Sequence, residues 1–510
     1  MENSTSKNLN SDEPQINYLS QFFKQSSHYL IGYVLIMISG FVSLPILTRI
    51  FSKSEYGVFS LVSITLWITL ALTKAGMQES AVRFYGEFKE KKRSEDISIF
   101  YTTLFGSAFI FALFFALVWW ITAHFFLSHV IDPEMRNLVG IISLLMISGS
   151  LYMREVNFLR AEQRTKILNS ILVFHRYFCM VLGLAFVLMI RRSLQSYYRG
   201  YLISEMSIAV FLAFVLFKQN KLKPADFSLV FLKECLFFGA PFIGLELATF
   251  LIKSADRYII QFFLGTEAVG VYSVGSNLCL YLRDALMFPL AFAITPLYME
   301  LWMKKGKEAT IKFISKVYYI MIMIAVPVVT GFVALNKQVI IILASTKYIE
   351  ASHIIPFIIF GAIIWGFFPL YTAGLYIQKQ TKKITAVVFI AVVFNCVLNI
   401  LLIPTLHIMG AAIATLITYV LLTIALIAIS NKYLKFKINL PAIIKVIVSA
   451  CLMFIIVIRI PSESNVWGIV IKIIVGAFTY SFCLVLLDKN IRLWIKRLIE
   501  IRQEKRNSTA

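Results

Sequence analysis

The sequence predicts an all-α integral membrane protein with about fourteen transmembrane helices, organised as two pseudo-symmetric six-helix lobes plus two C-terminal helices. Composition is the first observation behind this fold class, since 59% of the 510 residues are hydrophobic and the mean hydropathy is +0.80. The second is the recurrence of unbroken apolar runs of about 20 residues, which is the length that spans a bilayer as a helix. Strands of a membrane barrel would instead be shorter and alternate in polarity. The third observation is an internal repeat.

The expected spans follow one another with short connections. In the first half of the chain they are Tyr29–Ile50, Tyr56–Leu72, Ile97–Ile121, Leu138–Phe158, Ile167–Ile190, Tyr197–Phe217 and Cys235–Ile259. The second half contributes Val269–Ala293, Phe313–Leu335, Ile354–Ile377, Ile384–Ile403, Ile408–Ile429, Ile443–Ile458 and Val466–Leu487. No signal-peptidase site follows the first span, so we expect that helix to remain in the mature protein.

Basic residues indicate the orientation of these helices. If the N-terminus is cytoplasmic, the inner side carries roughly three times as many Lys and Arg residues as the outer side. The positive-inside rule therefore predicts a multi-pass protein of the cell inner (cytoplasmic) membrane with both termini cytoplasmic. The same bias explains the net charge of +22 without a nucleic-acid partner.

The internal repeat relates the two halves at a constant offset of 213 residues. Gly57-Val58-Phe59-Ser60 matches Gly270-Val271-Tyr272-Ser273, and Tyr85 and Glu87 match Tyr298 and Glu300. Because the offset spans an even number of helices, we expect the repeats to be parallel in the membrane. Two such lobes facing each other across a central cleft would form an alternating-access transporter.

The repeat and the polar stretches divide the chain into six parts. We expect a cytoplasmic N-terminal tail (1–26), an N-terminal lobe (27–217), a cytoplasmic basic linker (218–232), a C-terminal lobe (233–431), helices 13 and 14 (432–488) and a cytoplasmic basic tail (489–510). The last part fits either an amphipathic helix on the inner leaflet or a frayed basic end, because four apolar residues have helical spacing: Ile491, Trp494, Ile495 and Leu498.

Signatures of enzymes and metal sites are absent from the sequence. All six cysteines fall inside expected spans and the six histidines are scattered, which indicates neither a disulfide framework nor a metal site. Gly306-Lys307-Glu308 does not complete a phosphate-binding loop, and no loop is long enough for a hydrolase or transferase domain. We therefore expect no catalytic residues, no metal, no cofactor and no enzymatic activity.

Four charged residues deep inside expected spans are candidates for a substrate-binding cavity: Arg176, Arg283, Asp284 and Glu246. An ionisable side chain at the centre of the bilayer costs at least ~2.5–3.5 kcal/mol, so such residues line cavities or pair with one another. The arginines could bind an anionic group. Since adjacent residues point about 100° apart on a helix, Arg283 and Asp284 are expected to have separate partners, and a structural pair of Arg283 with Glu246 is the alternative.

A second group of charges lies nearer the helix ends. Lys253, Asp256 and Arg257 share one helix face near the outer end of their span. They fit either a gate that holds the outer mouth shut or an interfacial cluster whose side chains reach water. Arg83 and Arg160 lie at the inner ends of two helices, where they could contact a substrate headgroup or face the inner surface.

Several short motifs resemble those of the polysaccharide (O-antigen type) flippases of the multidrug/oligosaccharidyl-lipid/polysaccharide exporter superfamily. The motifs are Leu47 to Ser60, Gly76 to Glu87, Leu159 to Arg164, and Ser254 to Ile260 followed by Gly270 to Ser273. The resemblance implies twelve core helices in two lobes, often with two extra helices. It also implies a cationic central cavity for pyrophosphate and sugar, to which we assign Arg176 and Arg283 because they lie deepest.

The resemblance further implies a function. The protein would move an undecaprenyl-pyrophosphate-linked oligosaccharide from the inner to the outer leaflet by alternating access, for surface polysaccharide biosynthesis. Its partners would be this lipid-linked substrate, membrane lipids and the polysaccharide polymerase machinery. A lipid II flippase and a cation-coupled multidrug exporter, which would use Glu246 or Asp284, are alternatives in the same superfamily. A membrane-embedded polysaccharide polymerase or ligase is the alternative of another class.

Overall fold

The structure is a computed structural model that describes residues 13–90, 96–126, 132–435, 439–461, 465–489 and 491–492. These ranges contain helices and no β-strand. The chain divides into two compact units, the first comprising Met1–Ser43 and Val58–Leu251 and the second comprising Leu44–Gly57 and Ile252–Ala510. The all-α membrane fold class predicted from the apolar runs is confirmed.

The helices are long and apolar enough to cross a membrane many times. Over the described residues, ten helices meet this requirement, or up to twelve if each of two bent pairs is one span. This count is lower than the expected fourteen because several expected spans follow one another directly in α9 (Leu229–Leu343) and in α13 (Thr381–Ser430), separated by single non-helical residues. α9 has kinks at Gly265 and Gly306, and α13 has a kink at His407. The kinks separate the spans that the sequence predicts within each helix.

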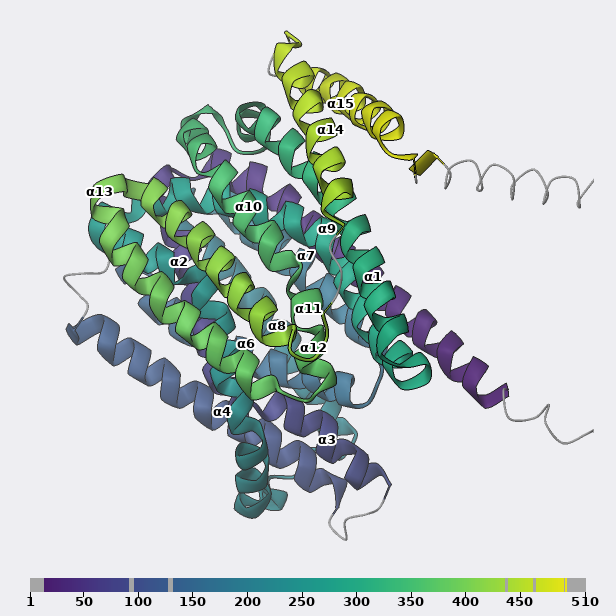
Figure 1. The fold of residues 1–510 in the computed structure, drawn as a ribbon. Helices are drawn as coiled ribbons and strands as arrows, with labels where there is room; N and C mark the ends of the chain where they lie inside the picture. The colour runs from purple at the N-terminus through teal and green to yellow at the C-terminus, as the bar shows by residue number, and fades with distance from the viewer. Residues whose placement is uncertain are drawn as a thin grey trace, which may run out of the picture. The chain divides into compact units, whose positions relative to one another are not determined.

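The first unit contains most of α1 (Glu13–Ile50) and α2 (Lys53–Lys74), the first part of α9, and the helices between them. Those helices are α3 (Met77–Lys89), α4 (Ile97–Ile121), η1 (Thr122–Phe126), α5 (Pro133–Arg136), α6 (Val139–Ala161), α7 (Thr165–Met189), α8 (Leu194–Lys218) and η2 (Pro224–Asp226). α6 packs against α4, α7 and α8 (Figure 1). An aromatic core that includes Phe84, Phe100, Phe158 and Phe231 joins α3, α4, α6 and α9.

Local sequence signals set several helix ends. The side chains of Asp96 and Ser193 accept hydrogen bonds from backbone N–H groups in the first turns of α4 and α8. These contacts satisfy donors that a helix N-terminus leaves free. Gly76 lies between α2 and α3 with a φ of 66°, which glycine adopts at little steric cost. The expected span Tyr56–Leu72 therefore continues into a second helix after a turn.

The second unit contains the rest of α9, followed by η3 (Thr346–His353), α10 (Ile355–Gly366), α11 (Phe368–Tyr371), α12 (Ala373–Ile377), α13, α14 (Leu440–Arg459) and α15 (Val466–Leu487). The expected span Ile354–Ile377 is broken into three short helices, with Pro369 in the first turn of the middle one. α10 packs against α13, and α14 lies beside α15 (Figure 1). Trp494, Ile495 and Leu498 of the expected amphipathic tail lie outside the described residues.

Two glycines of the internal repeat meet at a helix crossing in the second unit. A Cβ atom added to Gly57 would lie 1.9 Å from the carbonyl oxygen of Thr266, and one added to Gly270 would lie 2.0 Å from that of Lys53. Lys53 and Thr266 are related by the same offset as Gly57 and Gly270, so the two contacts are reciprocal. Only glycine allows backbones to approach this closely. The repeat in the sequence therefore has a counterpart in the packing.

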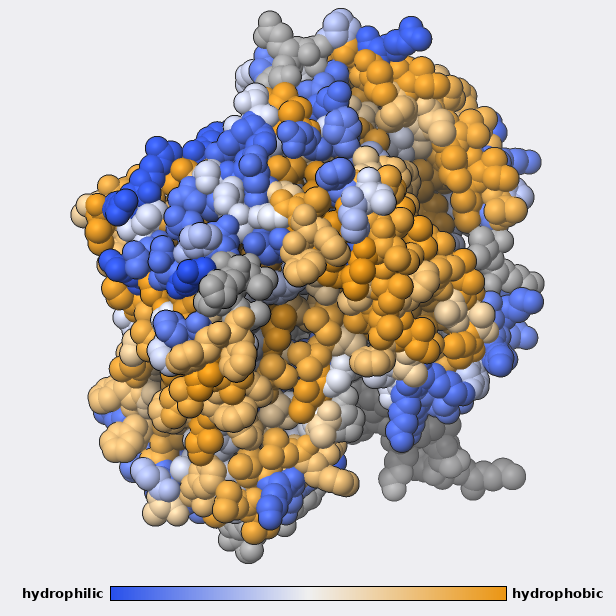
Figure 2. Space-filling view, turned by 90° about the vertical axis from the view of Figure 1, so that its left-hand side faces the viewer, coloured by the Kyte–Doolittle hydropathy of each residue, from blue (hydrophilic) through white to orange (hydrophobic). Residues whose placement is uncertain are grey.

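The outer surface carries many large hydrophobic side chains. Leu188 is 77% exposed, Phe237 is 89% exposed and Phe478 is 71% exposed. Figure 2 shows hydrophobic residues gathered over much of one face. Water-soluble monomers rarely expose contiguous apolar patches of this kind, whereas lipid tails solvate them. The surface is therefore that of a multi-pass membrane protein.

Candidate functional site

Arg283 and Asp284 lie on α9 in the second unit and bind each other. Asp284 Oδ1 accepts a hydrogen bond from Arg283 Nε at 2.7 Å and lies 2.6 Å from Nη2. The expectation of separate partners is wrong, because the long Arg283 side chain folds back onto its neighbour. Arg283 is 8% exposed, and its Nη1 has no hydrogen-bond partner among the described residues. This nitrogen can donate to an anionic ligand.

Lys253 and two aromatic side chains lie close to this ion pair. The Lys253 ammonium interacts electrostatically with Arg283 and Asp284, and its Nζ is 6.0 Å from the centre of the Trp365 ring. Trp365 stacks on Tyr419 with ring centroids 5.4 Å apart, and Tyr419 interacts electrostatically with Arg283. These five residues form a cationic–aromatic cluster. Its two cations outnumber its one carboxylate, so its charge favours an anion.

Asp256 and Arg257 are buried beside this cluster in the second unit, with 5% and 4% exposure. Asp256 accepts a hydrogen bond from the Tyr272 hydroxyl. Arg257 donates to the hydroxyl groups of Ser273 and Ser276 at 3.1 and 3.2 Å. The interpretation as side chains that reach water is therefore wrong for these two residues. Asp256 and Arg257 therefore connect the segment of α9 before Gly265 to the segment after it. A role of these two residues in an outer gate stays a prediction.

Arg176 lies on α7 in the first unit. Its Nε donates to the Ser39 hydroxyl on α1 at 2.8 Å. The adjacent Tyr177 donates its hydroxyl hydrogen to the Leu35 carbonyl oxygen on the same helix at 2.9 Å. The two contacts anchor α7 to α1, and a role of Arg176 in substrate binding stays a prediction.

Glu246 lies on the part of α9 that belongs to the first unit. Its Oε1 accepts a hydrogen bond from Lys74 Nζ of α2 at 2.8 Å. Glu246 and Arg283 each bind another residue of their own unit, and the alternative pair between the two stays a prediction. The Lys74 side chain is 12% exposed and that of Glu246 is 39% exposed, so water screens this ion pair only in part.

We expect Lys74→Ala and Glu246→Ala each to lower the stability of the purified protein. The double variant should be little less stable than either single variant, because removal of one charge already breaks the pair. The expected coupling free energy is about 0.5–1 kcal/mol for a pair that is partly exposed. Equilibrium unfolding of the wild type, the two single variants and the double variant in one detergent measures this coupling free energy. Additive effects would show that the 2.8 Å contact contributes nothing.

Arg83, in the middle of α3, and Arg160, in the last turn of α6, are both exposed. The Arg83 guanidinium lies 4.5 Å from the centre of the Phe238 ring and its Nε is 3.8 Å from Glu87 Oε1. Both arginines belong to the first unit and neither lies in the cationic–aromatic cluster. A contact of either arginine with a substrate headgroup stays a prediction.

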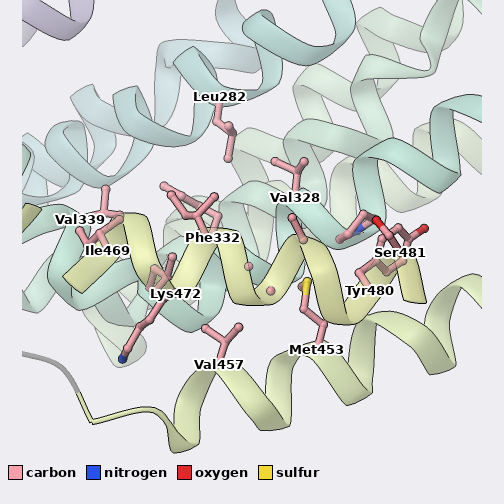
Figure 3. A pocket seen from close by; sticks show the side chains of 16 residues that line it. Leu282, Val328, Phe332, Val339, Met453, Val457, Ile469, Lys472, Tyr480 and Ser481 are labelled. Carbon is pink, nitrogen blue, oxygen red and sulfur yellow. The ribbon is translucent and has the colours of Figure 1, made fainter. Parts of the chain in front are cut away.

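An apolar pocket of about 370 Å³ lies between α9, α14 and α15 in the second unit. Figure 3 shows apolar side chains of all three helices directed toward it, including Leu282, Phe332 and Met453, whereas the Lys472 amino group points away. Leu282 directly precedes Arg283 on α9. One turn of α9 therefore contributes both to an apolar pocket and to the cationic–aromatic cluster.

Sequence reasoning missed several members of these sites. Trp365 and Tyr419 gave no signal, because aromatic residues make up 15% of the chain. Lys74 lies at the edge of its expected span and was not predicted to bind Glu246. Among the described residues, no group of three His, Cys, Asp or Glu side chains could hold a metal ion.

Comparison with protein families gives a match over the first part of the chain. Residues 46–353 match the profile of a family described as "Polysaccharide biosynthesis protein". A 240-residue stretch is 26% identical to the "Uncharacterized membrane protein MJ1068" of Methanocaldococcus jannaschii. That match covers 46% of this chain and 47% of the relative, so the chain spans about half the length of the curated relative it matches.

Solved structures share the fold at low sequence identity. "Lipid II flippase MurJ, inward closed conformation" has a TM-score of 0.75 and 13% identity, over 91% of this chain and 99% of that chain. An inward-facing multidrug resistance MATE family transporter of the MOP superfamily has a TM-score of 0.61 and 15% identity, over 79% and 94% of the two chains. A Vibrio cholerae MATE transporter has a TM-score of 0.56 and 12% identity, over 81% and 96%.

Proposed function

The chain belongs to the polysaccharide biosynthesis protein family, and on this premise we propose that it is a flippase for a lipid-linked oligosaccharide. The resemblance of its motifs to the exporter superfamily that includes the lipid II flippase and the MATE transporters is confirmed. The proposed substrate is an undecaprenyl-pyrophosphate-linked oligosaccharide of the O-antigen type. It would move from the inner to the outer leaflet of the cell inner membrane by alternating access, for surface polysaccharide biosynthesis.

The observation that carries this proposal is the junction of Leu282 and Arg283 on α9. Leu282 lines the apolar pocket, and Arg283 Nη1 in the cationic–aromatic cluster has no hydrogen-bond partner among the described residues. A lipid-linked sugar needs both kinds of site, because its pyrophosphate is anionic and its chain is apolar. We assign the pyrophosphate to Arg283 and Lys253, and the sugar to the faces of Trp365 and Tyr419.

The charges of the cluster would lower the main barrier to translocation. An unpaired phosphate in hydrocarbon loses its hydration, which costs many kcal/mol. Hydrogen bonds from a guanidinium to phosphate are charge-assisted and stronger in a site that excludes water. A second cation at Lys253 would share the charge of the pyrophosphate. The apolar tail needs no charged partner, because the apolar pocket that Leu282 lines and the surrounding lipid both solvate it.

Reconstitution in vesicles tests this function directly. The purified protein is placed in liposomes that contain a fluorescent undecaprenyl-pyrophosphate oligosaccharide, and transfer between leaflets is followed by a membrane-impermeant quencher. We expect transfer above that of protein-free vesicles, and equal transfer by Arg191→Ala, which changes an exposed arginine outside the cluster. Absence of transfer for this lipid, with an active control flippase in parallel, would contradict the proposal.

A lipid II flippase is the second candidate, because the fold is similar to that of MurJ with a TM-score of 0.75. The match covers 99% of the MurJ chain. The same vesicles with fluorescent lipid II separate the two functions. Faster transfer of lipid II than of the oligosaccharide lipid, together with growth of cells depleted of their own lipid II flippase, would favour this candidate. The proposed function predicts the opposite preference.

A cation-coupled drug exporter receives less support from the carboxylates. Glu246 is bound by Lys74, and Asp284 is bound by Arg283. A cation would have to displace a basic side chain from either of them, at the expense of an existing ion pair. A polymerase or ligase receives less support, because the solved structures that share the fold include a flippase and MATE family transporters.

A further inference from the structure

Three helices of the first unit enclose a carboxylate and an imidazole. Glu205 on α8 is 6% exposed, and its Oε1 lies 3.5 Å from Nε2 of His175 on α7. On α6, the Ser148 hydroxyl donates a hydrogen bond to Glu205 Oε2 at 2.7 Å. The ring of Tyr152, also on α6, stacks on the imidazole with centroids 3.9 Å apart. The site is therefore built by all three helices.

Among the described residues, no lysine or arginine is paired with this carboxylate. Within the part of the chain that the structure describes, the polar partners of Glu205 are Ser148 and His175. Arg176 is hydrogen-bonded to Ser39 of α1, and Lys74 of α2 is bound to Glu246. The other titratable groups that face the site from α6, α7 and α8 can all be neutral: Tyr152, Glu155, Cys179, Tyr197 and Tyr201.

The charge of the pair depends on one proton. An ionised Glu205 beside a neutral His175 gives this buried pair one net negative charge. One proton removes that charge, because it makes either a neutral carboxyl group or an imidazolium that pairs with the carboxylate. Nε2 of His175 is buried without a hydrogen-bond partner among the described residues, so this nitrogen can accept such a proton.

We propose that Glu205 and His175 form a proton-binding site in the first unit. The site takes one proton from the aqueous phase and holds it on either Glu205 Oε1 or His175 Nε2. Stacking on Tyr152 and the hydrogen bond from Ser148 fix the two groups at this distance. Buried ionisable residues of this kind act as proton relays in membrane transporters. Use of the site to couple a proton gradient to export rests on the proposed function, whereas proton binding itself does not.

Infrared spectroscopy of the full-length protein in lipid bilayers tests proton binding without any substrate. A pH titration of the wild type should contain a carboxyl C=O stretching band whose intensity changes with pH. We expect this band to be lost in Glu205→Gln and its midpoint to be shifted in His175→Gln. Glu79→Gln, which changes an exposed carboxylate of α3, should leave the band unchanged.

Identical titrating carboxyl bands in the wild type, Glu205→Gln and His175→Gln would overturn the proposal. If Glu205→Gln does not fold, the same infrared titration of Glu205→Asp and His175→Gln tests the proposal. If the band has the wild-type midpoint in both of these variants, a proton-binding site formed by Glu205 and His175 is equally excluded.

Coupling is measured separately in cells whose surface polysaccharide depends on this protein. An ionophore that collapses only the pH gradient should reduce export by the wild type. Export by Glu205→Gln, at whatever level remains, should no longer respond to the ionophore. An equal response of both proteins would exclude coupling through this site. A failure of the proposed function would instead abolish the dependence of polysaccharide on the protein and leave the infrared result intact.

Discussion

Replacement of Arg283 by alanine is expected to abolish most oligosaccharide export while the protein still accumulates in the membrane. The substitution removes the buried Nη1 donor of the cationic–aromatic cluster together with one of its two cations. A hydrogen bond to a charged group contributes about 1.5–3 kcal/mol, so headgroup binding should weaken by about 10- to 100-fold. The measurement is the rate of transfer in vesicles as a function of the concentration of lipid-linked oligosaccharide.

Two further variants separate charge from geometry at this position. Arg283→Lys keeps the positive charge but loses the fork of nitrogens that grips a phosphate, so partial transfer is expected. Arg191→Ala should transfer at the wild-type rate, since Arg191 is exposed and distant in sequence from the cluster. Normal transfer by Arg283→Ala would remove this residue from the binding site.

The ion pair with Asp284 offers a stricter test. Asp284 accepts from Nε and lies 2.6 Å from Nη2 of Arg283, so Arg283→Ala also leaves a partly buried carboxylate without its cation. If that carboxylate caused the defect, Arg283→Ala combined with Asp284→Ala would restore transfer. We expect the double variant to stay inactive, because it still lacks the guanidinium. Recovery would assign Arg283 a structural role.

The membrane-spanning segments could be predicted because the length of an apolar run reflects bilayer thickness directly. The breaks inside them were harder to foresee. Gly76 follows Lys74 and Ala75, which is a recognisable signal for a helix end, yet the span was expected to stop at Leu72. Gly265 and Gly306 have non-helical backbone angles and break α9 between the spans that the sequence predicts there.

Partners of the charged residues could not be predicted, because helical spacing carries no information on contacts between distant segments. Glu246 binds Lys74, which is 172 residues away in the sequence. Arg283 binds its own neighbour, although adjacent side chains leave a helix in different directions. Glu205 was overlooked, yet an acidic residue inside the apolar run Tyr197–Phe217 is itself a signal of a buried site.

Substitution of either glycine at the reciprocal crossing of Gly57 and Gly270 is expected to lower the stability of the protein strongly. Gly57→Ala and Gly270→Ala would each place a methyl carbon about 2 Å from a backbone oxygen of the facing helix. Backbone atoms cannot rotate away, so the helices must separate, at an expected cost of about 1–3 kcal/mol or more. Thermal unfolding of the purified variants in one detergent measures this loss.

A matched control is available in the same chain. Gly86 lies inside α3, where an added Cβ would meet nothing within 4 Å, so Gly86→Ala should be neutral or stabilising by about 0.5–1 kcal/mol. The double variant of Gly57 and Gly270 should lose less than the sum of the single losses, because one separation of the helices relieves both clashes. If Gly270→Ala were as stable as the wild type, the close helix crossing would be contradicted. If the losses of stability were strictly additive, Gly57 and Gly270 would not lie at the same crossing.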